Sequence, residues 1–258
     1  MSQAPAGIPV ARDHVPSVTT DQMIEVDRAM VEDYGIELIQ MMENAGRNLA
    51  HLCRQRFLSG DPRGKAVTVL AGRGGNGGGS LVAARRLANW GANVVVVIAT
   101  PADAFEGVAA HQLGILQRMN VPLLEAVPTA ADADVDLVID GLIGYSLSGP
   151  PRGVTAELIR WANEQAAPVL SLDAPSGLDT ATGTVFEPAI HAAATMTLAL
   201  PKRGLAEDAN QEFVGELYLA DISVPPALYD SPRLGLEVGN IFADADIVLL
   251  RGAQTEGG

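Results

Sequence analysis

Short apolar runs recur along the chain, separated by glycine, proline and polar residues. Most of them are continuous rather than alternating, as in "NVVVVIA" (93–99) and "VDLVID" (135–140). A strand with one face in water alternates apolar and polar residues, whereas a strand covered on both faces is apolar throughout. Several of the runs are separated by stretches with helical spacing. The pattern therefore predicts an α/β fold with a mostly parallel central sheet and helices on both of its faces.

Two helices are predicted before the first strand. "TTDQ" places Thr19 as an N-cap with Gln22 three positions later, which is a capping box. Within 35–57, apolar residues keep the i, i+3, i+4 spacing of a core-facing stripe: Leu38, Met41, Met42, Ala45, Leu49, Leu52 and Cys53. With later helices ending near Trp90 and covering about 104–119 and 154–165, the sequence predicts a three-layer Rossmann-like sandwich with two N-terminal helices.

The chain is predicted to form one folded domain over residues 19–237. Residues 1–18, which contain three prolines, are expected to form a flexible leader. The C-terminal tail, 238–258, carries one apolar patch before a glycine-rich end, and it packs either on the domain or on a partner.

Charge and composition exclude several classes of partner. The net charge of −14 over 258 residues disfavours nucleic acid, whose binding needs clustered Lys and Arg. A small phosphorylated ligand remains compatible, because backbone N–H groups can hold it. Cys53 is the single cysteine and is expected in the core, and His51 and His111 lack the neighbours that a zinc site needs. Without an 18-residue apolar run or the apolar centre of a signal peptide, a cytoplasmic protein without membrane contact is expected.

The most unusual segment is "AGRGGNGGGSLVAARRL" (71–87), a glycine-rich loop between a predicted strand and a predicted helix. Glycines let backbone N–H groups approach a ligand without an intervening Cβ, a geometry that suits phosphate. The loop lacks the P-loop pattern and matches the dinucleotide fingerprint only weakly. A merely flexible or tight turn is the alternative interpretation.

Two acidic residues each end an apolar strand. Asp140 precedes a Gly/Ser/Pro loop, and Asp173 precedes the turn "APSG". Each carboxylate is either a loop cap or a group aimed into a crevice, where the pair could ligate a hard cation or divide acid and base roles. Lys202 and Arg203 follow another strand, and a solvated turn is predicted for them, with contact to a phosphate as the alternative.

Five segments taken together carry a family resemblance. In this order, "MMENAGR", the glycine and asparagine loop, "DGLIGYSLSGPPRG", "LDAPSGLDTATG" and "TLALPKRGL" resemble the NAD(P)HX epimerase family, also called the YjeF N-terminal domain family. The resemblance implies a Rossmann-like fold that interconverts the epimers of the hydrated cofactors NADHX and NADPHX. It also implies a bound potassium ion and a homodimer.

The resemblance also implies roles for individual residues. The family loop reads G-x-G-N-N-G-G-D-G, so Asn76 matches a potassium ligand, whereas Gly75 and Gly79 replace the first Asn and the Asp. Asp140 and Ser176 match the other potassium ligands. The implied substrate-binding residues are Gly75, Asn76, Gly77, Gly78, Gly79, Gly144, Tyr145, Ser146, Leu147, Ser148, Gly149, Pro150 and Asp173.

The expected chemistry follows from the substrate. Its hydroxyl lies on C6 beside the ring nitrogen, so cleavage of the C–O bond gives an iminium-like or ring-opened species, and water returning to the other face inverts the centre. Asp173 is the predicted acid or base, and Asp140 is a second catalytic carboxylate held ionised by potassium. Because Gly75 and Gly79 remove polar groups, two alternatives stay open. One is a noncatalytic ligand-binding or dimerisation scaffold, and the other is an enzyme for another small molecule.

Overall fold

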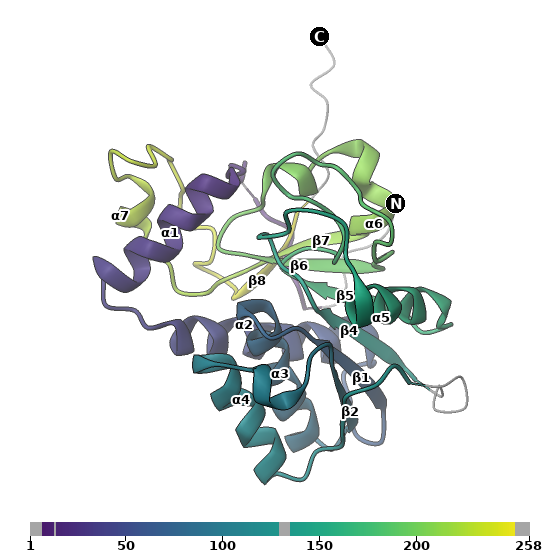
Figure 1. Ribbon diagram of the computed structural model, residues 1–258. Coiled ribbons are helices and arrows are strands. Elements are labelled where there is room, and N and C mark those ends of the chain that lie inside the picture. The colour runs from purple at the N-terminus through teal and green to yellow at the C-terminus, as the bar shows by residue number, and fades with distance from the viewer. Residues whose placement is uncertain (1–6, 13, 129–134, 251–258) are drawn as a thin grey trace.

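A single eight-stranded sheet forms the centre of the protein (Figure 1). The computed structural model describes residues 7–12, 14–128 and 135–250. In these residues the strand order is β3-β2-β1-β4-β5-β6-β7-β8, and only the β7–β8 pair is antiparallel. The strands are β1 (Ala66–Ala71), β2 (Asn93–Ile98), β3 (Leu123–Leu124), β4 (Leu137–Gly141), β5 (Val169–Leu172), β6 (Ala194–Leu198), β7 (Glu216–Ala220) and β8 (Ile247–Leu249). The predicted α/β fold with a mostly parallel sheet is confirmed.

Helices cover both faces of this sheet. On one face pack α2 (Leu38–Leu52), α3 (Gly75–Asn89) and α4 (Gly107–Arg118), and on the other packs α5 (Gly153–Glu164). Neighbouring residues of β1 belong to different cores, since Val69 packs with α2, α3 and α4 and Leu70 packs with α5. The strands are continuous apolar runs for this reason. The shorter elements are a π-helical turn (Cys53–Phe57), 3₁₀ turns (Ala102–Ala104, Arg203–Leu205 and Asp208–Asn210), α6 (Gln211–Val214) and α7 (Pro226–Tyr229).

The strand order reverses between β1 and β4. From β1 the chain proceeds to β2 and β3 on one side, then returns to β4 on the other side of β1. Leu70 is paired with Asp140, and the Gly72 N–H donates to the Gly141 carbonyl at 3.0 Å. The two loops that follow these strands must diverge here, and such a switch point is where open α/β sheets bind ligands.

Helix α1 (Thr20–Glu32) lies beside the sheet rather than flat on it (Figure 1). The predicted capping box is confirmed: the Gln22 N–H donates to Thr19 Oγ1 at 3.1 Å, and the Thr19 N–H donates to Gln22 Oε1 at 2.9 Å. Its buried residues Met23, Val26 and Met30 pack in a second core with residues of α2 and α7. This arrangement brings α1 to the carboxyl end of the sheet.

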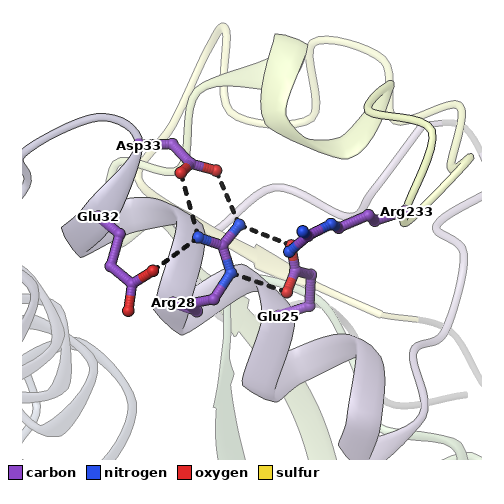
Figure 2. Close-up of polar contacts among 5 residues, drawn as sticks. All are labelled: Glu25, Arg28, Glu32, Asp33 and Arg233. Carbon is purple, nitrogen blue, oxygen red and sulfur yellow. Dashed lines mark hydrogen bonds and ion pairs between the residues drawn. The ribbon is translucent and has the colours of Figure 1, made fainter.

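A charged cluster ties α1 to the segment after α7 (Figure 2). Arg28 donates to Glu25, Glu32 and Asp33, and Arg233 donates to Glu25 Oε1 at 3.0 Å. Much of the cluster is solvent-exposed, so each ion pair contributes at most about 1 kcal/mol. The cluster therefore acts locally, by holding one side of α1 against the segment that contains Arg233.

The predicted leader and tail differ from the structure. Ile8 is buried, the Ala11 N–H donates to the Leu249 carbonyl, and the Leu249 N–H donates to the Pro9 carbonyl. The flexible leader predicted over 1–18 is thus wrong for its described part. Part of the predicted tail forms β8 (Ile247–Leu249) and pairs with β7, which is the alternative of packing on the domain, so the sheet extends past the predicted boundary at residue 237. Residues 1–6 and 251–258 lie outside the described residues. No helix in the described ranges is long and apolar enough to cross a membrane.

Candidate active site

A cavity of about 300 Å³ opens beside the switch point of the sheet. Its walls come from α1, α2, the first turn of α3, the loop after β4 and the ends of β5 and β6. Seven of the predicted substrate-binding residues line it: Gly75, Asn76, Gly79, Gly144, Tyr145, Ser146 and Asp173. The structure therefore brings three separate sequence segments to one pocket.

The remaining predicted site residues do not line the cavity: Gly77, Gly78, Leu147, Ser148, Gly149, Pro150, Asp140 and Ser176. Two of the glycines have a packing role instead. A Cβ on Gly77 would lie 1.6 Å from the Gly72 carbonyl oxygen, and one on Gly78 would lie 2.6 Å from Met42 Sδ. Gly77 excludes a larger residue because the contact is with backbone, whereas the flexible end of the Met42 side chain would have to move for a Cβ at position 78.

The glycine-rich loop presents the N-terminus of α3 to the cavity. Gly74 is the N-cap and has no capping side chain, and the first turn contains no acidic residue. The N–H groups of a first helical turn lack intrahelical partners and carry partial positive charge. Since Gly74, Gly75 and Asn76 all line the cavity, this end of α3 can bind an anionic group such as a phosphate.

Asp173 lies at the end of β5 with both carboxylate oxygens engaged. Oδ1 pairs with Lys202 Nζ, and Oδ2 accepts the Tyr145 N–H at 3.0 Å. Asp173 has a φ of 65°, a left-handed conformation that is costly for a residue with a side chain. The Asp173 N–H donates to the Met196 carbonyl at 2.7 Å, which holds this conformation and directs the carboxylate into the cavity.

Asn76 lies next to Asp173 with an unpaired amide. Neither its Oδ1 nor its Nδ2 has a hydrogen-bond partner within the described ranges, although both atoms are buried. A Cβ on Gly144 would lie 3.0 Å from Asp173 Oδ2 and 3.4 Å from Asn76 Cγ, so both side chains meet the backbone of this glycine. A buried amide without partners indicates a ligand that the protein atoms alone do not supply.

Asp140 is buried below the cavity and serves the surrounding loops. Oδ1 accepts from the Ser176 hydroxyl at 2.6 Å and from the Leu142 N–H, and Oδ2 accepts from the Ser171 hydroxyl and the Ser176 N–H, both at 2.8 Å. Burial raises the pKa of Asp140, and these hydrogen bonds oppose the rise. The carboxylate fixes the turn at Ser176 and the start of the loop after β4, a geometry different from that of a group in contact with substrate.

Comparison with known proteins identifies the family of this chain. The family model described as YjeF-related protein N-terminus matches residues 38–204. The chain belongs to this family. Among its relatives, the NAD(P)H-hydrate epimerase of Dehalogenimonas lykanthroporepellens is 44% identical over 225 residues, which cover 86% of this chain and 87% of that protein. The bifunctional NAD(P)H-hydrate repair enzyme Nnr of Salinibacter ruber is 35% identical over 83% of this chain, which spans 42% of that longer protein.

A solved structure supports the same assignment. The crystal structure of the yeast protein YNL200c superposes with a TM-score of 0.76 at 25% identity, and the match covers 92% of this chain and 100% of the yeast chain. The matched segment of the YjeF-related family begins at α2, so α1 lies outside it.

Two cavity residues of this YjeF-related chain were missed by sequence reasoning. Lys202, predicted in a solvated turn, is fully buried, and its Nζ also donates to the Leu198 carbonyl at 3.0 Å. That prediction is wrong, because the strand end folds inward onto Asp173. Asp27 lines the cavity from α1 and accepts the Tyr145 hydroxyl at 2.6 Å. Its position four residues after Met23, on the buried stripe of α1, was the available signal.

Proposed function

We propose that this chain is an NAD(P)H-hydrate epimerase that interconverts the C6 epimers of NADHX and NADPHX. The observation that carries the proposal is the placement of Asp173. A fixed, ion-paired carboxylate lies in the same cavity as the N-terminus of α3, so one bound dinucleotide can meet both. The relatives named as epimerases support the assignment at the level of the whole domain.

The chain's own residues divide the work of binding and proton transfer. The first turn of α3 binds a phosphate of the dinucleotide through its N–H groups, which compensates for the acidic character of the chain. Asp173 exchanges a proton with the C6 hydroxyl or with the water that replaces it, and such a group accelerates a reaction by about 10²- to 10⁴-fold. Asp140 acts at a distance by fixing the loops that carry Ile143 and Ser176.

The site also fits the potassium ion that the family resemblance implies. The buried, unpaired Asn76 amide supplies an oxygen ligand, and the family resemblance adds Ser176 and Asp140, which hydrogen-bond each other. Ser176 contacts the backbone of Ile143, while Asn76 meets Gly144, the next residue along the chain. When bound, the ion supplies positive charge that favours ionised carboxylates nearby. We infer that Asn76, Asp140 and Ser176 hold it.

We also infer that the chain forms a homodimer through α1 and the start of α2. Ile24, Val31, Tyr34 and Leu38 are large apolar residues that remain exposed there. Ile24 and Val31 are seven positions apart and share one helix face. Large apolar side chains that remain exposed close together in the sequence are typical of a protein interface. Light scattering should give twice the chain mass of 26.9 kDa, and Ile24→Glu should lower it.

The test of the function is direct. Purified protein is incubated with each separated NADHX epimer, and interconversion is followed by chromatography. We expect the wild type to equilibrate the epimers and Asp173→Asn to do so at least about 10²-fold more slowly. A folded wild type that binds NADP without interconversion would favour the noncatalytic scaffold. An Asp173→Asn variant with the full rate would reject the role of this carboxylate.

A further inference from the structure

A second carboxyl group faces the cavity and has no part in the function as stated so far. Asp27, in the middle of α1, lines the same cavity as Asp173. Tyr145 joins the two residues, since its hydroxyl donates to Asp27 Oδ2 at 2.6 Å and its N–H donates to Asp173 Oδ2 at 3.0 Å. The two carboxyl groups therefore share one bridging residue but come from different elements, α1 and the end of β5.

The surroundings of the two carboxyl groups differ. Asp173 is ion-paired with Lys202, whereas Asp27 has a neutral hydroxyl as its hydrogen-bond partner. Arg28 follows Asp27 in the sequence, but its guanidinium is engaged by Glu25, Glu32 and Asp33 (Figure 2). The nearest cation along α1 is thus already paired with other carboxylates.

These surroundings favour the protonated form of Asp27. Burial raises its pKa, and the charge of Asp173 adds to the rise, while the hydrogen bond from Tyr145 and the charge of Lys202 oppose it. Asp173 differs in its contacts, because it is ion-paired with the Lys202 ammonium. Two carboxyl groups in one site with such different surroundings form the usual pattern of an acid and base pair.

We propose that Asp27 is the general acid of the epimerisation and that Asp173 is its general base. The proposal rests on the proposed function. Asp27 donates its proton to the C6 hydroxyl oxygen as the C6–O bond breaks, and that bond's electron pair leaves with the oxygen as water. The lone pair of the ring nitrogen forms a C=N bond at the same time.

The second half of the reaction uses Asp173. A water oxygen forms the new C6–O bond on the opposite face, the C=N electron pair returns to nitrogen, and the water's proton passes to the Asp173 carboxylate. Because Asp27 comes from α1 and Asp173 from the end of β5, the proposal requires the ring to bind between them, with one carboxyl group on each face. The product is the other epimer, and the proton returns from Asp173 to Asp27 through solvent, so atoms and charge balance over the cycle.

The test compares three variants with the wild type in the interconversion assay across a range of pH. Asp27→Asn keeps the shape of the side chain and an oxygen for the Tyr145 hydroxyl, but it carries no transferable proton. We expect kcat to fall by about 10²- to 10⁴-fold with KM unchanged, and the decline of kcat/KM at high pH to disappear. Asp27→Glu restores a carboxyl group that can donate a proton, and its kcat should be at least about tenfold higher than that of Asp27→Asn.

Asp21→Asn is the matched control, since it makes the same change at an exposed position of α1. It should leave kcat and the pH profile unchanged. A folded Asp27→Asn variant with wild-type kcat, or one affected only in KM, would overturn the assignment, as would an Asp27→Glu variant as slow as a folded Asn variant. If Asp27→Asn does not fold, the assignment is tested with Asp27→Glu alone, from its kcat and from the decline of its kcat/KM at high pH. An inactive wild type would instead reject the proposed function, and the role of Asp27 with it.

Discussion

Lys202 and Asp173 form an ion pair inside the protein, and Lys202 is 0% exposed and Asp173 4% exposed. Lys202 Nζ also donates to the Leu198 carbonyl and to Thr197 Oγ1, so its ammonium has partners from β6 as well. A buried pair with these additional hydrogen bonds holds a carboxylate in one position against the cavity. Removal of one member would leave the other charge buried without compensation.

We therefore expect Lys202→Met to be strongly destabilising. A buried charge that loses its partner typically costs about 3–5 kcal/mol, which urea unfolding would measure as a lower midpoint. The double variant Lys202→Met/Asp173→Asn removes both charges and should recover part of this loss. Equal stability of Lys202→Met and the wild type would show that the pair is not isolated from water as the structure indicates.

Much of the fold could be predicted from the sequence because its signals are local. The apolar runs, the capping box at Thr19 and the glycine-rich loop each act within a few residues. The short β8 and the contacts of residues 9–11 with it were missed, since these segments are stabilised by pairing with each other and with β7 rather than by their own propensity. A strand of three residues has too little pattern to detect.

The candidate site could also be predicted only in part, where its residues lie close to strand ends or motifs in the sequence. Asp173 directly follows β5, so the rule that ligands bind at the carboxyl ends of parallel strands located it. Asn76, in the first turn of α3, was assigned from the family resemblance. Lys202 and Asp27 reach the cavity through the inward turn after β6 and through the docking of α1, which depend on long-range packing. Asp140 lies near the end of β4, but its role depends on four hydrogen bonds that no spacing in the sequence reveals.

Gly144 provides a test of the close contact between Asn76 and Asp173. A Cβ at this position would lie 3.0 Å from Asp173 Oδ2, so Gly144→Ala should displace the carboxylate or the loop. We expect a loss of about 1–3 kcal/mol in stability and a lower epimerisation rate. Gly239→Ala is the control, because a Cβ there has no heavy atom within 4 Å. The contact would not be essential if the two variants had the same rate.

The potassium site can be tested without measuring activity. An ion that binds only the folded state raises its stability, so the unfolding temperature should be higher in KCl than in NaCl of equal concentration. Asn76→Ala removes a proposed ligand and should abolish that difference. Asn89→Ala, an exposed change at the other end of α3, should retain it. Equal unfolding temperatures for the wild type in both salts would contradict a potassium-selective site.

Asp27 should leave a signature in the pH dependence of stability. The folded state raises the pKa of Asp27 above the ordinary value of an aspartate, mainly through burial, so the folded protein binds this proton more tightly than the unfolded chain does. The free energy of unfolding contributed by Asp27 is therefore fully present below pH 4 and is lost as pH rises through the folded-state pKa. The loss amounts to about 1.4 kcal/mol for each unit by which the pKa is raised. Asp27→Asn cannot lose this contribution.

The measurement is urea unfolding of the wild type and of Asp27→Asn between pH 4 and pH 8. We expect the stability of the variant to increase relative to the wild type as pH rises, because only the wild type loses the contribution of Asp27. Other titrating groups, such as the Glu25 and Arg28 pair, contribute equally to both proteins. Asp21→Asn should not show this trend, since its side chain is exposed. Parallel curves for Asp27→Asn and the wild type would mean that Asp27 is ionised throughout this range, and the carboxyl group would then be unsuited to act as the acid.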